Sequence, residues 1–161
     1  MRKSLVILIS SLAVSALITG CASKQAAPGA PSADSVDLEA AKKLRMPIVI
    51  YRLGVKKDEN GMSRPVIYFV NASPKPVSVV TFHVAGHTKD GRTLMLWADD
   101  YEKVPPGKPS KNGMLGGGWK NAEITCVELK EADIHVGGKS LRFLPENINQ
   151  LFQDVSLNRC Q

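Results

Sequence analysis

The chain has 161 residues and a formal net charge of +6, with 21 Lys and Arg residues against 15 Asp and Glu residues. This length suits one domain of ordinary size with a terminal extension. The basic residues are scattered singly or in pairs among acidic ones, which excludes a basic stripe and argues against nucleic acid as a partner.

The N-terminus has the order of segments found in an export signal. Arg2 and Lys3 precede a predominantly apolar run over residues 5–18, and a basic start followed by such a run is typical of a secretory signal. A membrane-spanning helix needs roughly 20 apolar residues, so this run is too short for a comfortable permanent span. Residues 1–20 are therefore predicted to be a signal peptide that is removed.

The apolar run closes with the residues Ile18-Thr19-Gly20-Cys21. They resemble the lipobox of bacterial lipoproteins, in which a branched apolar residue, a small residue and Gly or Ala precede an invariant Cys. The resemblance implies that Cys21, through its nucleophilic thiolate, takes a lipid and becomes the N-terminus of the mature protein. Ala22 stands where lipoproteins kept in the inner membrane typically carry Asp. The resemblance therefore implies lipid anchoring in the outer membrane, with the domain expected to face the periplasm and the cell exterior as the alternative.

Residues 21–46 are predicted to connect the lipidated end to the domain. Residues 22–34 are rich in Ala, Ser, Pro and Gly and carry no large apolar residue, so we expect a flexible tether. In residues 35–44, Val36, Ala40 and Leu44 share one helical face ahead of Pro47, which predicts a short helix.

Beyond Pro47 the pattern changes to short apolar runs and alternation separated by turn residues, which indicates strands. The predicted strands, in chain order, are residues 48–55, 65–70, 77–85, 93–97, 122–130, 133–136 and 139–143. Residues 98–121, rich in Pro and Gly, are predicted to be a long loop. Within 122–130, Ile124, Leu129 and either Cys126 or Val127 compete for the inner face, which suggests a β-bulge.

The C-terminal region has a different period. Pro145 suits the first turn of a helix, and apolar residues recur at helical spacing at Ile148, Leu151, Phe152 and Val155. Residues 145–155 are therefore predicted to form a short amphipathic helix that packs on the sheets. Taken together, residues 47–161 are predicted to be one all-β domain, an antiparallel sandwich with a short C-terminal helix.

Three motifs occur together in the strand region. A strand ends at Asn71 before a Ser/Lys/Pro turn, Trp119 precedes the run Cys126-Val127-Glu128-Leu129, and a hairpin turns at Gly137-Gly138. These motifs resemble those of small immunoglobulin-like sandwich domains in exported bacterial envelope proteins, over about residues 48–143. The resemblance implies an immunoglobulin-like fold, and it implies no particular activity because sandwiches host many.

With Cys21 assigned to lipid, two cysteines remain in the mature chain. Cys126 and Cys160 would share an oxidising compartment, so we expect them to form a disulfide. The bond would tie the end of the chain to the strand that contains Cys126.

No residue pattern predicts catalysis. The serines lack a Gly-x-Ser-x-Gly elbow, and the triple glycine at 116–118 lacks the Lys-Ser/Thr of a phosphate-binding loop. His83, His87 and His135 lack further ligands at metal-binding spacing. The sequence therefore predicts no catalytic residue, no metal and no cofactor.

The Gly-rich stretch instead favours a docking loop formed by Met114, Leu115 and Trp119. Closure of the core by Trp119 is the alternative for the same residues.

The expected function is that of a lipid-anchored, non-enzymatic envelope protein whose sandwich binds another protein, as an assembly factor or accessory subunit. The alternative is a module for peptidoglycan, glycan or lipid, which would use Trp97, Tyr101 and Trp119 with nearby lysines.

Overall fold

The computed structural model describes residues 32–113 and 115–160. The signal peptide, Cys21, most of the tether and Met114 lie outside the described residues. The elements, in chain order, are η1 (Ala33–Ser35), α1 (Leu38–Lys43), β1 (Ile48–Lys57), β2 (Ser63–Asn71), β3 (Val77–Thr88), β4 (Thr93–Asp100), β5 (Ile124–Val136), β6 (Lys139–Phe143), η2 (Ile148–Leu151) and η3 (Val155–Asn158).

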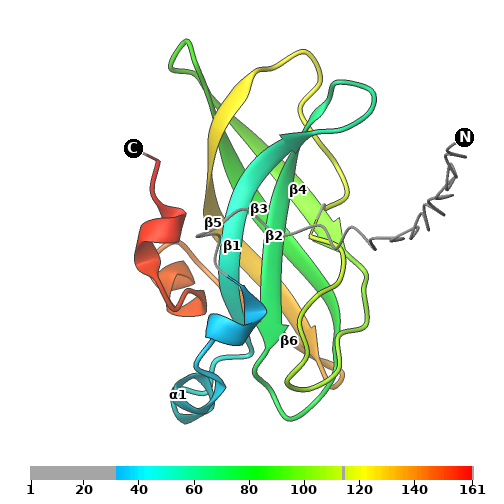
Figure 1. Cartoon of the computed structure of the whole chain (residues 1–161), viewed down its shortest axis with the longest axis vertical. Coiled ribbons are helices and arrows are strands. Elements are labelled where there is room, and N and C mark those ends of the chain that lie inside the picture. The colour runs from blue at the N-terminus through cyan, green and yellow to red at the C-terminus, as the bar shows by residue number, and fades with distance from the viewer. Residues whose placement is uncertain (1–31, 114, 161) are drawn as a thin grey trace, which may run out of the picture. The chain divides into compact units, whose positions relative to one another are not determined.

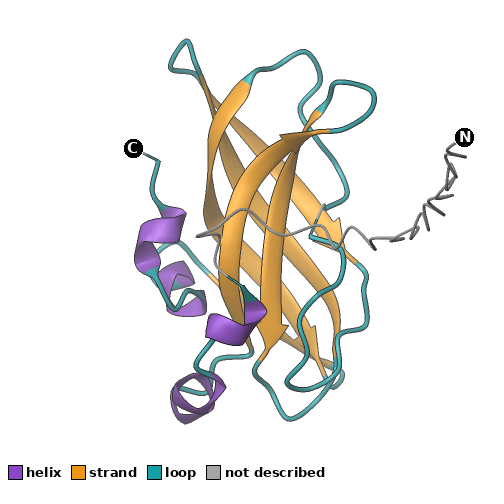
Figure 2. Cartoon of the chain, in the orientation of Figure 1, coloured by secondary structure: helices purple, strands orange, loops and turns teal. Residues whose placement is uncertain are grey.

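The strands form two antiparallel sheets, which confirms the predicted all-β sandwich (Figures 1 and 2). One sheet pairs β1 with β2, and the other has the order β4-β3-β5-β6. Alternate residues of β2 and β3 point into the core, where Phe69 and Phe82 meet edge to face with ring centroids 6.5 Å apart. Among the described residues, no helix is both long enough and apolar enough to span a membrane.

The region predicted as a long loop is mostly attached to the sheets. β4 continues to Asp100, and the following segment runs beside β2, with bridges from Val70 to Pro109 and from Ser63 to Trp119. Its backbone accepts a hydrogen bond from the Ile67 amide at 2.8 Å. The outer edge of β2 needs such partners because unpaired backbone groups there would be costly. The residues of this segment do not alternate between apolar and polar, so the sequence did not indicate that the segment pairs with β2.

Trp119 closes the core at one end of the sandwich. Its side chain is only 6% exposed, and its indole packs on Gly86, where an added Cβ would lie 2.8 Å from Cζ2. Leu115 is buried as well. These two residues of the predicted docking loop therefore fill the interior, which is the alternative that the sequence left open for Trp119.

β5 is one long strand where two were predicted, and it contains two bulges. Its pairing with β3 skips Thr125 and Lys130. Each extra residue reverses which side chains face inward, so Ile124, Val127 and Leu129 are all buried. The bulge suggested by the sequence is present.

The predicted short C-terminal helix is present as two separate 3-10 helices, η2 and η3, rather than as one helix over residues 145–155. Ile148, Leu151 and Phe152 are buried as expected, but Val155 is 41% exposed. Phe152 forms a parallel bridge with Ile50 of β1. The side-chain amide of Asn158, at the end of η3, ties this region to β5: its Oδ1 accepts from the Leu129 amide at 2.6 Å and its Nδ2 donates to the Leu129 carbonyl at 3.0 Å.

The predicted N-terminal helix is present as α1. The Asp37 carboxylate caps it by accepting a hydrogen bond from the Ala40 amide at 2.9 Å. The buried face differs from the predicted one, since Ala41 is buried while Leu44 is 74% exposed. Ala41 packs with Val49 and Ala72 in a small cluster separate from the main core.

Candidate anion-binding groove

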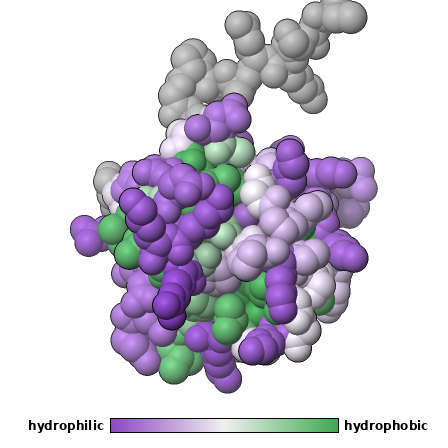
Figure 3. Space-filling model, turned by 90° about the horizontal axis from the view of Figure 1, so that it is seen from below, coloured by the Kyte–Doolittle hydropathy of each residue, from purple (hydrophilic) through white to green (hydrophobic). Residues whose placement is uncertain are grey.

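A groove of about 780 Å³ lies beside α1, between the turn after β2 and the β5–β6 hairpin. Figure 3 views the domain from the α1 end and shows apolar surface between hydrophilic groups. The apolar lining includes Met46, Pro47, Pro74, Pro106, Val136 and Leu141. Such a lining can bury part of a ligand, because apolar surface removed from water stabilises by about 25 cal/mol per Å².

The charged groups that line the groove are all cations. They are Lys42, Arg45, Lys75 and Lys139, and no carboxylate joins them in the described lining. Lys42 pairs with Glu39 at 2.7 Å. Within residues 32–113 and 115–160, no ion pair involves Arg45, Lys75 or Lys139. The groove therefore presents a local excess of positive charge, which attracts an anionic group.

Arg45 is held at the groove by an unusual backbone conformation. α1 ends in a Schellman motif, in which the amides of Arg45 and Met46 donate to Lys42 and Ala41, both at 3.0 Å. The motif puts Arg45 at φ 55°, a conformation that favours Gly and costs other residues about 1–2 kcal/mol. This position delivers a guanidinium both to this groove and to a second groove of about 730 Å³.

A buried asparagine organises the turn that carries Ser73 and Lys75. The Asn71 Nδ2 donates to the carbonyls of Lys75 and Val104, at 2.8 Å and 2.9 Å. Its Oδ1 accepts from the backbone amide of Ser73 at 2.9 Å and from its hydroxyl at 2.7 Å. The aliphatic stem of Lys75 lies across Gly137, where a Cβ would overlap it. These contacts preorganise the wall of the groove.

The groove is suited to binding rather than to bond-breaking. Its described lining contains neither a histidine nor a cysteine nor a carboxylate that could move a proton near neutral pH. The one hydroxyl, on Ser73, shares its single proton between two acceptors, Asn71 Oδ1 at 2.7 Å and the Lys75 carbonyl oxygen at 2.6 Å. The groove can therefore hold a ligand through apolar contacts and through attraction between its cations and an anionic group.

Sequence reasoning did not identify this groove, because its residues come from four separate segments. The available signal was the placement of Lys75 and Lys139 beside predicted turns. Turns at one end of a sandwich lie near each other, but which turns share an end depends on strand order.

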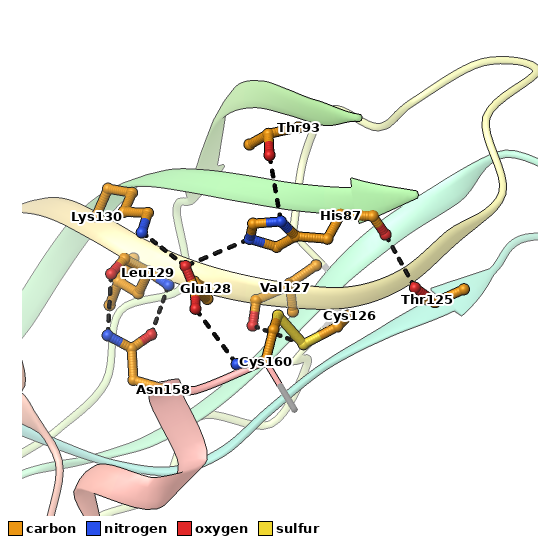
Figure 4. The surroundings of a disulfide bond; sticks show 10 residues. All are labelled: His87, Thr93, Thr125, Cys126, Val127, Glu128, Leu129, Lys130, Asn158 and Cys160. Atoms are coloured by element: carbon orange, nitrogen blue, oxygen red, sulfur yellow. Dashed lines mark hydrogen bonds and ion pairs between the residues drawn. A yellow bond between two sulfur atoms is a disulfide. The ribbon is translucent and has the colours of Figure 1, made fainter. Parts of the chain in front are cut away.

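The structure confirms the predicted disulfide between Cys126 and Cys160, with the Cα atoms 5.7 Å apart. Figure 4 shows that His87 and Glu128 lie beside it. The ammonium of Lys130, 2.6 Å from Glu128 Oε2, holds the pKa of that carboxyl below its usual range. No pattern in the sequence indicated that His87 would lie beside these groups.

The aromatic residues predicted for sugar stacking separate into two groups. Trp97 and Tyr101 are 49% and 73% exposed, and Trp97 stacks on His83 with ring centroids 4.2 Å apart. Trp119 is buried and cannot offer its face to a ligand. The three therefore do not form one aromatic platform.

Comparison of the chain with protein-family models, with curated proteins and with solved structures finds no match in any of the three. Any argument about function therefore depends on the groove and on the other surfaces described above.

Proposed function

We propose that the protein is a lipid-anchored, non-enzymatic binding module of the cell envelope, which docks an acidic segment of a partner protein in the groove. The observation that carries the proposal is the apolar groove lined by four cations and no carboxylate. A peptide with one or two acidic residues beside apolar ones would complement it in both shape and charge.

The cellular location in this proposal rests on the resemblance of the residues before Cys21 to a lipobox. Anchoring by lipid at Cys21 would place the domain at the outer membrane, facing the periplasm. The predicted tether, residues 22–34, would reach roughly 20 Å as a flexible chain. The module would therefore meet partners close to the membrane, as an assembly factor or accessory subunit does.

Site-specific photo-crosslinking in intact cells tests the proposal. A photoreactive residue replaces Leu141, which lines the groove and is 40% exposed. The matched control replaces Val155, which is 41% exposed and lies outside the groove lining. We expect a discrete protein adduct from position 141 and none from position 155.

Charge reversal then tests whether the cations are responsible. Lys75→Glu with Lys139→Glu should reduce the adduct at least roughly tenfold, since each reversed contact is worth on the order of 1 kcal/mol. Lys56→Glu with Lys57→Glu changes the net charge equally, at the end of β1. Equal loss in both double variants would reject specific docking in the groove.

A second candidate function uses the same groove for the phosphate of an anionic lipid. It is favoured by the position of the groove against α1, the helix that follows the predicted tether. In this case the photoreactive residue at position 141 yields no protein adduct. Instead, the unlipidated mature chain with Cys21→Ser floats with vesicles that contain anionic lipid, and the Lys75/Lys139 variant does not.

A further inference from the structure

The disulfide lies within a cluster of metal-binding donor atoms that the proposed function does not use. Donor atoms of His87, Glu128 and Cys160 all lie within 4.8 Å of one another. The Cys126 sulfur is bonded to that of Cys160, so breaking the disulfide would free a second sulfur next to these three donors. Imidazole, carboxylate and two sulfurs together form a ligand set that zinc uses.

The two bulges of β5 bring these residues to one surface. Cys126 and Glu128 lie between the bulges at Thr125 and Lys130, on the face opposite to the buried Val127 and Leu129. His87 of β3 is the register partner of Cys126. The chain end that carries Cys160 is positioned by its amide, which donates to Glu128 Oε1 at 3.3 Å.

Contacts around the cluster already orient its donor atoms (Figure 4). The Thr93 hydroxyl lies 3.2 Å from His87 Nδ1, which leaves Nε2 facing Glu128 Oε2 at 3.3 Å. Metal-binding histidines commonly engage their second ring nitrogen in this way, which fixes the ring for coordination. A metal ion would take the place of the contact between Nε2 and Oε2, and the Lys130 ammonium, now 2.6 Å from the same Oε2, would have to move away.

We propose that reduction of this disulfide opens a tetrahedral zinc site made by Cys126 Sγ, Cys160 Sγ, His87 Nε2 and the Glu128 carboxylate. With zinc–sulfur and zinc–nitrogen bonds of roughly 2.3 and 2.0 Å, tetrahedral ligand atoms lie roughly 3–4 Å apart. The donor atoms of His87, Glu128 and Cys160 lie within 4.8 Å of one another, so small side-chain movements would bring them to that spacing, and Cys126 Sγ is released to join them when the disulfide is broken.

The chemistry balances with a dithiol as the reductant. The dithiol transfers two electrons and two protons, so the protein disulfide becomes two thiols and the dithiol becomes a disulfide. Binding of Zn²⁺ then displaces both thiol protons, because the thiolate is the ligand. While the disulfide is intact, both sulfurs are committed to each other, so the redox state controls the site.

Equilibrium dialysis of the unlipidated mature chain (Cys21→Ser) against zinc tests this directly. Treatment with a dithiol, followed by its removal, should raise bound zinc from below about 0.1 to about 1 ion per chain. Replacement of zinc by cobalt should give the visible absorption of a tetrahedral thiolate site. Less than about 0.1 zinc per reduced chain would refute the proposal.

Matched histidine variants distinguish the folded site from any pair of thiols. His87→Ala should weaken zinc binding by roughly 10-fold or more. His83→Ala, on the same strand and stacked on Trp97, should leave it unchanged. Equal affinity in the two variants would show that the cysteines alone bind zinc. Circular dichroism shows whether the reduced chain remains folded. A reduced chain that is unfolded and stays unfolded when zinc is added would also overturn the proposal.

Discussion

Replacement of Asn71 by Ala is the most informative perturbation of this fold. The side chain is fully buried and makes three hydrogen bonds, two to carbonyl groups and one from the Ser73 amide, and it shares the Ser73 hydroxyl proton with the Lys75 carbonyl. Each such bond contributes about 1 kcal/mol net. Asn71→Ala should therefore lower the free energy of unfolding by about 3–4 kcal/mol, before any cost of the cavity.

Urea denaturation followed by circular dichroism measures this loss. We expect a lower midpoint with an unchanged slope, because the surface exposed on unfolding stays the same. Asn60→Ala, at an exposed turn position, serves as the control and should change stability by less than about 0.5 kcal/mol. A loss below about 1 kcal/mol for Asn71→Ala would show that the buried network does not hold the turn.

Three further changes probe the disulfide, the core and a half-buried carboxyl. Cys126→Ser with Cys160→Ser should cost about 3.8 kcal/mol in urea denaturation, from chain entropy over the 34-residue separation. Gly86→Ala should cost about 1–3 kcal/mol in the same assay, since its Cβ would overlap the indole packed there. Burial raises the pKa of Asp100 in the folded chain. The contribution of protonated Asp100 to stability is therefore fully present below the pKa of the unfolded chain, and it is lost as the pH rises through the pKa of the folded chain. Asp100→Asn should therefore gain stability relative to the natural chain between pH 4 and pH 7, by no more than about 1 kcal/mol, as measured by thermal melts across this range.

Each of these predictions has a result that would contradict it. Gly54→Ala is the control for the core change, because nothing lies within 4 Å of its Cβ position. If it destabilises as much as Gly86→Ala, overlap is not the cause. A cysteine double variant as stable as the natural chain would contradict the entropy argument. A stability difference for Asp100→Asn that does not vary with pH would contradict the raised pKa.

Much of the fold could be read from local patterns. The strands, the short helix before Pro47 and the β5 bulge each follow from the alternation of apolar residues and the position of turn residues. The disulfide pairing was predictable because only two cysteines remain after Cys21 is assigned to lipid. The secondary structure depends on residues that are neighbours in sequence, and the disulfide pairing depends on the number of cysteines. Both can therefore be predicted without a structure.

Tertiary structure decided the features that involve distant segments. The edge partner of β2, the burial of Trp119 on Gly86 and the 3-10 form of the C-terminal region arise where backbone and amide groups find partners elsewhere in the chain. None of these contacts leaves a periodic signal in the sequence.

The candidate sites also differ in whether the sequence alone could indicate them. The motif that ends at Cys21 is contiguous in sequence, so the resemblance to a lipobox could be stated from the sequence alone, and the lipid anchor stays a prediction. The groove and the cluster around Cys160 draw residues from three or more segments each. Their composition depends on which strands are neighbours and on the bulges that turn Cys126 and Glu128 outward. Sequence by itself therefore determined the proposed anchor and the strand pattern, whereas strand order, register and the packing of distant segments decided which charges and which candidate ligands meet.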